Sequence, residues 1–203
     1  TYSGQPLDVV FISNGESNAE QNWQHLNDCN NIDNRITRVD GVKGRAEAYR
    51  AALEASNTDW AFCVFAKLEV NPDFDWSWQP DRLQEAKHYI FHAENPVNGL
   101  VYGHMAMIAY NKQMVAVNQA TGLDFTLDQP HEVVPILSGT AWYTDSPWMA
   151  WRTAFREVIK LMTTLPDVES EYRLNKWLDD NSDEADPQWS RLGAEDAEEY
   201  YNS

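Results

Sequence analysis

Apolar residues form a nearly continuous run over residues 7–13 (LDVVFIS), the pattern of a central β-strand that is covered on both faces. The run ends at Asn14-Gly15, a dipeptide typical of turns. Residues 17–20 then have the spacing of a capping box, which opens a helix. A second short apolar stretch follows over residues 36–39. The pattern therefore predicts a strand, a helix and another strand in that order.

The alternation of strands and helices continues to residue 70. After Gly44, Tyr49, Ala52 and Leu53 recur at helical spacing, which predicts a helix. Residues 60–70 (WAFCVFAKLEV) read as a single buried strand. Strands and helices that alternate with short loops favour right-handed crossovers and parallel pairing. We therefore predict an α/β fold of the Rossmann type, a mixed, mainly parallel sheet flanked by helices.

The order of elements is less regular beyond residue 71. Further strands are expected over residues 88–92, 100–110, 132–137 and 140–143. Asp145 is a cap signal followed by Pro147, and predicts a helix that ends near residue 165. A last helix is expected over residues 168–178. We divide the chain into a main domain, residues 1–165, and an acidic helical extension, residues 166–203.

The charge of the chain narrows the classes of partner. A net charge of −17 argues against sequence-independent binding of nucleic-acid phosphates, which requires clustered basic residues. Much of this charge lies after residue 165, among several aromatic residues. That end is either a solvated tail, the simpler expectation, or a docking segment for a protein partner. No stretch approaches the about 20 apolar residues of a membrane span. With no signal peptide visible at its start and only two cysteines, the chain fits a reducing cytoplasm.

Residues 7–17 (LDVVFISNGES) and 38–65 (RVDGVKGRAEAYRAALEASNTDWAFCVF) together resemble the first half of family-2-like GT-A glycosyltransferases. The resemblance covers roughly residues 7–70 and implies a nucleotide-sugar donor at the carboxyl ends of parallel strands. The later segments YGHMAMIAYNK, LDFTLD and WRTAFREVIKL are similar to a bacteriophage-type subgroup. This second resemblance implies a location in the host cytoplasm or in a virus particle.

The resemblance also implies which residues bind the donor. Ser13, Asn14, Gly15 and Glu16 form the first strand-end loop. Asp40 ends the second strand, where the family has an Asp near the base or ribose, and Arg45 follows it closely. A turn without ligand contacts remains the alternative for Asn14-Gly15.

The third strand departs from the family pattern. Where the family carries a metal-binding Asp-x-Asp, this chain has Phe65-Ala66-Lys67, with Glu69 two residues further on. Lys67 is a candidate to neutralise the diphosphate leaving group without metal. Glu69 is a candidate for a lone Mn or Mg ligand, although such sites draw on several oxygens. The third interpretation of this strand end is a protein that has lost catalytic activity and retains a binding function. We favour Lys67 narrowly over a strand-end lysine that points to water.

Several other residues are candidates for the remaining chemistry. Asp124 is the expected general base for the acceptor hydroxyl. His104 follows a glycine that allows close approach of a ligand, and Trp76 lies in a segment, residues 75–78, expected to form an exposed aromatic platform. Arg152 and Arg156 either bind phosphate or pair with local carboxylates.

The leading hypothesis is a glycosyltransferase that moves a sugar from a nucleotide-sugar donor to an unknown acceptor. In the metal-free form of this hypothesis the chain needs no cofactor. The alternative is a catalytically silent GT-A-like module with a binding or structural role in a virus particle or larger assembly.

Overall fold

The computed structural model describes residues 4–30, 32–96, 99–118, 126, 128–142, 155–156, 158–159, 162 and 187–202. It divides into two compact units. The first consists of Thr1–Ala93 and Tyr102–Ala141, and the second of Glu94–Val101 and Trp142–Ser203. The domain boundary expected at residue 165 lies outside the described residues and stays a prediction.

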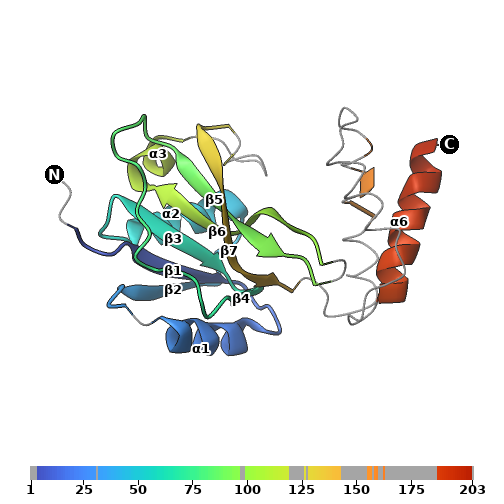
Figure 1. Ribbon diagram of the computed structural model, residues 1–203, viewed down its shortest axis with the longest axis horizontal. Coiled ribbons are helices and arrows are strands. Elements are labelled where there is room, and N and C mark those ends of the chain that lie inside the picture. Colours follow the sequence, from blue (N-terminus) through green and yellow to red (C-terminus); the bar gives the residue numbers. More distant parts are fainter. Residues whose placement is uncertain are drawn as a thin grey trace. The chain divides into compact units, whose positions relative to one another are not determined.

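The strands form a mixed seven-stranded sheet in the order β2-β1-β3-β6-β5-β7-β4 (Figure 1). They are β1 (Asp8–Ser13), β2 (Ile36–Asp40), β3 (Trp60–Phe65), β4 (Leu68–Val70), β5 (His88–Glu94), β6 (Val101–Asn111) and β7 (His131–Ala141). β1 pairs in parallel with β2 and β3, whereas β6 pairs antiparallel with β3 and β4 antiparallel with β7. The predicted α/β fold class is confirmed.

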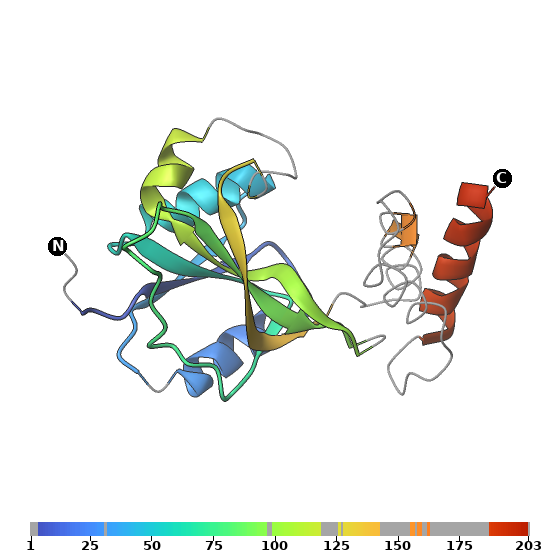
Figure 2. The same cartoon turned by 45° about the horizontal axis from the view of Figure 1, so that its top comes forward.

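Helices cover both faces of the sheet. The helices α1 (Ala19–Cys29), α2 (Arg45–Glu54) and α3 (Lys112–Val117) belong to the first unit with the sheet, whereas α6 (Pro187–Asn202) belongs to the second unit. α1 lies on one face of the sheet and α2 on the other (Figures 1 and 2). α3 was not predicted; it begins where the side chain of Asn111 accepts a hydrogen bond from the backbone of Met114.

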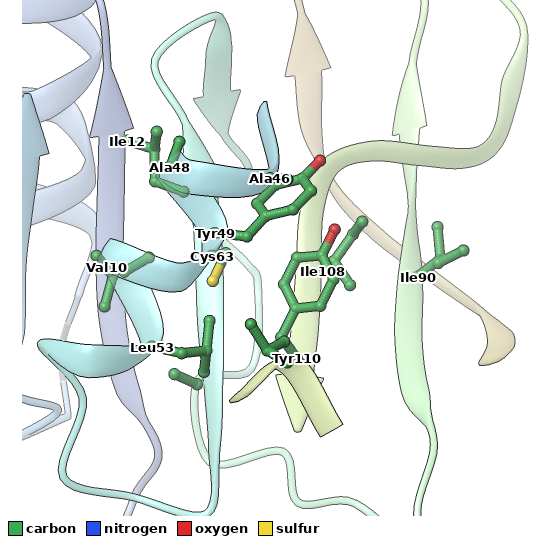
Figure 3. Close-up of a cluster of buried hydrophobic side chains, with 13 residues drawn as sticks. Val10, Ile12, Ala46, Ala48, Tyr49, Leu53, Cys63, Ile90, Ile108 and Tyr110 are labelled. Atoms are coloured by element: carbon green, nitrogen blue, oxygen red, sulfur yellow. The ribbon is translucent and has the colours of Figure 1, made fainter. Parts of the chain in front are cut away.

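The core on the α2 face forms around β1, because every residue of β1 is buried and its side chains alternate between the faces. Val10 and Ile12 point to α2, where Tyr49 packs beside Tyr110 with ring centroids 4.7 Å apart (Figure 3). Cys63 is fully buried in this cluster, and burial raises the pKa of its thiol. Burial of this kind makes Cys63 a packing residue and leaves it without reactive character.

The opposite face carries an aromatic cluster around Phe62. Phe74 and Trp76 contact the Phe62 ring edge-on, with centroids 5.7 and 5.3 Å away. The interpretation of residues 75–78 as an exposed platform is wrong for Trp76, whose side chain is 0% exposed. The segment after β4 folds back over the sheet, because these rings bury large apolar areas there.

The strand expected over residues 60–70 breaks into two. β3 ends at Phe65, and β4 starts at Leu68 and joins the far edge of the sheet beside β7. Two side chains of α1 hold the corner between them. The amide of Asn22 donates to the carbonyl oxygen of Ala66 at 2.6 Å, and Nε2 of His25 lies 2.7 Å from the carbonyl oxygen of Val70.

By contrast, the two strands expected over residues 132–137 and 140–143 are one continuous strand, β7. Gly139 lies inside it, opposite Val70 of β4. A Cβ at this position would come 2.1 Å from the carbonyl oxygen of Glu69. Position 139 is a glycine because β4 approaches its backbone too closely for a side chain, and β7 runs through this position without a break.

The second unit contains a small helical core. Val158, Ala194 and Ala197 are buried together, and Phe155 packs against them. Residues 187–202 of the acidic end form α6, in which Ala194 and Ala197 are buried whereas Glu195 and Glu199 are exposed, and the choice between a solvated tail and a docking segment stays a prediction. The helix expected over residues 168–178 lies outside the described residues. Among the helices that the structure describes, none has the length and apolar character that a membrane span requires.

Candidate functional site

The carboxyl ends of β1 and β2 form a polar rim at one edge of the sheet. The parallel register places Ser13 beside Asp40. The hydroxyl of Ser13 donates to Oδ1 of Asp40 at 2.5 Å. Ser13 is buried, whereas the Asp40 side chain is 63% exposed. A ligand at this edge therefore meets the Asp40 carboxylate first.

Arg38, two residues before Asp40 on β2, connects this rim to α1. Its Nε donates to Oγ of Ser13 at 3.1 Å, and its Nη2 donates to Oε1 of Glu20 at 2.7 Å. The hydrogen bond from Arg38 lowers the pKa of Glu20 and raises that of Arg38. Sequence reasoning missed Arg38, although the period of two places it on the same face of β2 as Asp40.

The turns after β1 and β2 shape the rim. Gly15 has φ 80° and Gly41 has φ 74°, left-handed values that favour glycine. The backbone N–H of Asn14 donates to Oε2 of Glu16 at 2.6 Å, and that of Gly41 donates to the carbonyl oxygen of Ser13 at 3.0 Å. Glu16 thus has a structural role within its own loop, beside any contact with a ligand.

Arg45 and His104 are brought to the same edge by α2 and β6. Met107 pairs with Val64 of β3, so the earlier residues of β6 extend past the end of β3. Nη1 of Arg45 lies 3.9 Å from Sδ of Met105, next to His104. Nδ1 of His104 accepts the N–H of Ala106 at 3.0 Å, which leaves its Nε2 as the protonated nitrogen of the neutral ring.

The end of β3 is built differently from the rim. Phe65 contacts Tyr49 edge-on at 5.6 Å, and Ala66 is buried with its carbonyl oxygen bound by Asn22. Lys67 is half-buried in the corner.

These residues do not fit a divalent metal. Phe65, Ala66 and Lys67 supply no carboxylate, and Glu69 is exposed on β4 opposite Thr140. Within the described part of the chain, no three His, Cys, Asp or Glu side chains come close enough together to hold a metal ion. A lone carboxylate is a weak site, because Mg²⁺ and Mn²⁺ require several oxygen ligands.

Of the other predicted site residues, the structure places Trp76 elsewhere in the first unit. Trp76 is buried in the aromatic cluster around Phe62. Arg156 is exposed in the second unit. Asp124 and Arg152 lie outside the described residues, so their expected roles stay predictions.

Solved structures with a similar arrangement identify the type of fold. The chain is similar to a mannosyltransferase from Pyrobaculum calidifontis in complex with GDP-Man and Mn²⁺, with 11% identity over 98% of this chain and 76% of that chain and a TM-score of 0.50. The fold is GT-A-like. No family model and no curated protein matches the sequence.

Further similarity extends to HddC from Yersinia pseudotuberculosis and to 4-diphosphocytidyl-2C-methyl-D-erythritol synthase from Anaerococcus prevotii. HddC is 9% identical over 66% of this chain and 91% of its own, with a TM-score of 0.43. The synthase is 10% identical over 70% and 94%, also with a TM-score of 0.43.

Proposed function

We propose that this protein is a glycosyltransferase that uses a nucleotide-sugar donor and needs no metal. The observation that carries the proposal is the hydrogen-bonded pair Ser13–Asp40, at the carboxyl ends of adjacent parallel strands in a GT-A-like sheet. Ligands of open α/β sheets bind at this edge, where loop amides and strand-end side chains face outward. The phage-related origin suggested by the second half of the chain belongs to the same proposal.

In the proposed site, each residue at the edge has a separate task. Asp40 accepts a hydrogen bond from the nucleoside, and the loop of Asn14, Gly15 and Glu16 borders the nucleotide. Arg45 and Lys67 supply positive charge to the diphosphate. Transfer of the sugar leaves a diphosphate whose negative charge grows in the transition state, and a positioned cation stabilises that state more than the ground state. Asp124 is the proposed base that removes the proton of the acceptor hydroxyl.

A catalytically silent module is the second candidate. The observation that favours it is the end of β3, where Phe65 packs on Tyr49 and Ala66 is tied to Asn22. A strand end built into the core in this way has no free carboxylates for a metal. Such a protein binds its nucleotide or its partner without turnover.

Donor binding is the first test. The folded chain is titrated with UDP-, GDP- and ADP-sugars in EDTA and in Mn²⁺, with the shift in melting temperature and calorimetric Kd as readouts. We expect one donor to bind equally well in both conditions. Asp40→Asn weakens it on the order of tenfold. The matched control is Asp33→Asn, which removes the same charge at the other end of β2. Absence of binding by every donor overturns the transferase proposal.

Turnover separates the transferase from the silent module. Release of nucleoside diphosphate is followed with the donor that binds, with water as the acceptor. We expect Lys67→Ala to reduce release by at least about tenfold and Lys67→Arg to restore much of it. The control is Lys87→Ala, since the carbonyl of Lys87 bonds Trp60 at the opposite end of β3. Tight donor binding without any release supports the silent module instead.

A further inference from the structure

We propose that Arg38 is a positioning residue, which acts through Ser13 to orient the Asp40 carboxylate toward the nucleoside. This inference rests on the proposed function, because it assigns a task within the same donor site. Arg38 itself lies behind the rim: its Nη2 is 4.0 Å from Oδ1 of Asp40, beyond hydrogen-bonding distance.

Arg38, Ser13 and Asp40 form a series of two hydrogen bonds, and the chemistry of the three side chains fixes the donor and the acceptor in each. An arginine side chain has only donors, so Oγ of Ser13 must accept from Nε of Arg38. The single hydroxyl hydrogen of Ser13 is then directed to Oδ1 of Asp40, which accepts it at 2.5 Å. Arg38 therefore decides which way the Ser13 hydroxyl points, and with it which oxygen of Asp40 is occupied.

Arg38 is itself held in place from three sides. Its guanidinium carbon lies 5.5 Å from the centroid of the Phe11 ring and 5.6 Å from that of Trp23. Glu20 binds Nη2 from α1. A planar guanidinium makes these stacking and hydrogen-bonding contacts at once, which a lysine ammonium in the same place does not.

The consequence concerns what Asp40 can recognise. With Oδ1 engaged by Ser13, the outward side of the carboxylate is left to the ligand, and a carboxylate only accepts hydrogen bonds. The matching ligand group is an O–H or N–H donor of the nucleoside, either a ribose hydroxyl or a ring N–H. Fixing the carboxylate in advance reduces the ordering entropy lost on binding.

The test measures Kd by calorimetry for the nucleoside diphosphate that binds the wild-type chain. We expect Arg38→Gln and Ser13→Ala each to weaken binding several-fold. The double variant should bind no more weakly than either single variant, because both substitutions break the same series of hydrogen bonds. The matched control is Arg35→Gln. Arg35 donates to Oδ2 of Asp8 and to the carbonyl of Ala55 at the other end of β2, so its loss lowers stability and leaves Kd unchanged.

Ligand analogues distinguish positioning from a general structural effect. The same variants are titrated with the 2′-deoxy, 3′-deoxy and ring-N-methylated forms of that nucleotide. For the analogue that lacks the recognised donor, Arg38→Gln causes no further loss of affinity relative to wild type. Which analogue shows this identifies the donor as ribose or base.

Three outcomes overturn the inference. They are an unchanged Kd in Arg38→Gln, losses that multiply in the double variant, and an equal loss by Arg38→Gln on every analogue. If Arg38→Gln does not fold, Ser13→Ala carries the analogue series alone. In all these cases the wild type still binds its nucleotide, so the proposed function survives. A wild type that binds no nucleotide overturns the proposed function and this inference together.

Discussion

Two neighbouring strand ends of this sheet are built in opposite ways. The end of β1 and β2 is polar and open, with Ser13 bonded to an exposed Asp40. The end of β3 is closed, with Phe65 and Ala66 packed against α2 and α1. The first is held by side-chain hydrogen bonds that leave the Asp40 carboxylate exposed. The second is held by core packing and by bonds to backbone carbonyls.

The difference suggests that the two parts of the proposed donor site can be tested separately. The part assigned to the nucleoside depends on the register of β1 and β2. The part assigned to the diphosphate depends on the β3–β4 corner, where Lys67 is half-buried. The following predictions test how independent the two strand ends are.

The largest expected effect is that of Gly139→Ala on the closed end. The new Cβ would lie 2.1 Å from the Glu69 carbonyl oxygen and 2.9 Å from Cα of Val70, so β4 must move away from β7. We expect a loss on the order of 3 kcal/mol in the free energy of unfolding, measured by urea denaturation.

The control for this change is Thr140→Ala, one residue further along β7, which removes atoms and adds none. Thr140 pairs with Glu69, so the same strand pairing is probed without a steric clash. We expect a loss of at most about 1 kcal/mol. Equal stability of Gly139→Ala and wild type would show that β4 is not fixed by this close approach.

Asn22→Ala is expected to have the next largest effect. Asn22 is buried, and its removal leaves the Ala66 carbonyl oxygen without its 2.6 Å partner. We expect a loss of about 2 kcal/mol in unfolding free energy, the range for a buried group left unsatisfied. Exchange of the amides of residues 66–70 should also become faster.

Asn27→Ala provides the comparison on the same helix. Its side chain also donates to a carbonyl oxygen, that of Trp23, but within α1 and at an exposed position. We expect a change within about 0.5 kcal/mol. If the two variants lose equal stability, Asn22 does not hold the closed end.

The smallest expected effect is a pH dependence that arises away from both strand ends. His88 is buried, with Nδ1 accepting the N–H of Asn111 and Nε2 bonded to Oε1 of Gln129. Burial lowers the pKa of His88 below 6.5, so on acidification the unfolded chain takes up a proton that the folded chain does not. We expect the unfolding free energy to fall as the pH drops below that value.

Denaturation series at several pH values check this. His88→Gln should remove the slope near pH 6.5, and the control His92→Gln on the same strand should retain it. The Arg38–Glu20 pair at the polar rim affects stability in a different pH range. Arg38 lowers the pKa of Glu20, so the pair stabilises the fold above pH 4.5. This stabilisation is lost only as the pH falls through the lowered pKa. An unchanged slope in His88→Gln would assign the acid sensitivity elsewhere.

The sequence predicted the first half of the fold well, because β1, α1, β2 and α2 each have a clear apolar period. It did not predict the break at Ala66-Lys67. Leu68 and Val70 are buried, as they would be in a continuing strand, and the corner is set by Asn22 from a distant helix. Local pattern carries no information on such a partner.

The same limit applies to the site. Ser13 and Asp40 were predicted as strand-end residues, whereas Arg38 was missed because its role depends on the register between β1 and β2. Trp76 was misread because its own loop is polar, and the ring that buries it, Phe62, belongs to β3. A residue whose role depends on contacts with another strand can be predicted only once the pairing of the strands is known.

The corner between β3 and β4 also has a consequence for the order of folding. Only Ala66 and Lys67 separate two strands that lie at positions three and seven of the sheet. β4 pairs with β7, and β5, β6 and α3 lie between these two strands in the sequence. Closing so long a stretch of chain is entropically unfavourable and slow. We therefore expect the segment that contains Lys67 to reach its native geometry late in folding.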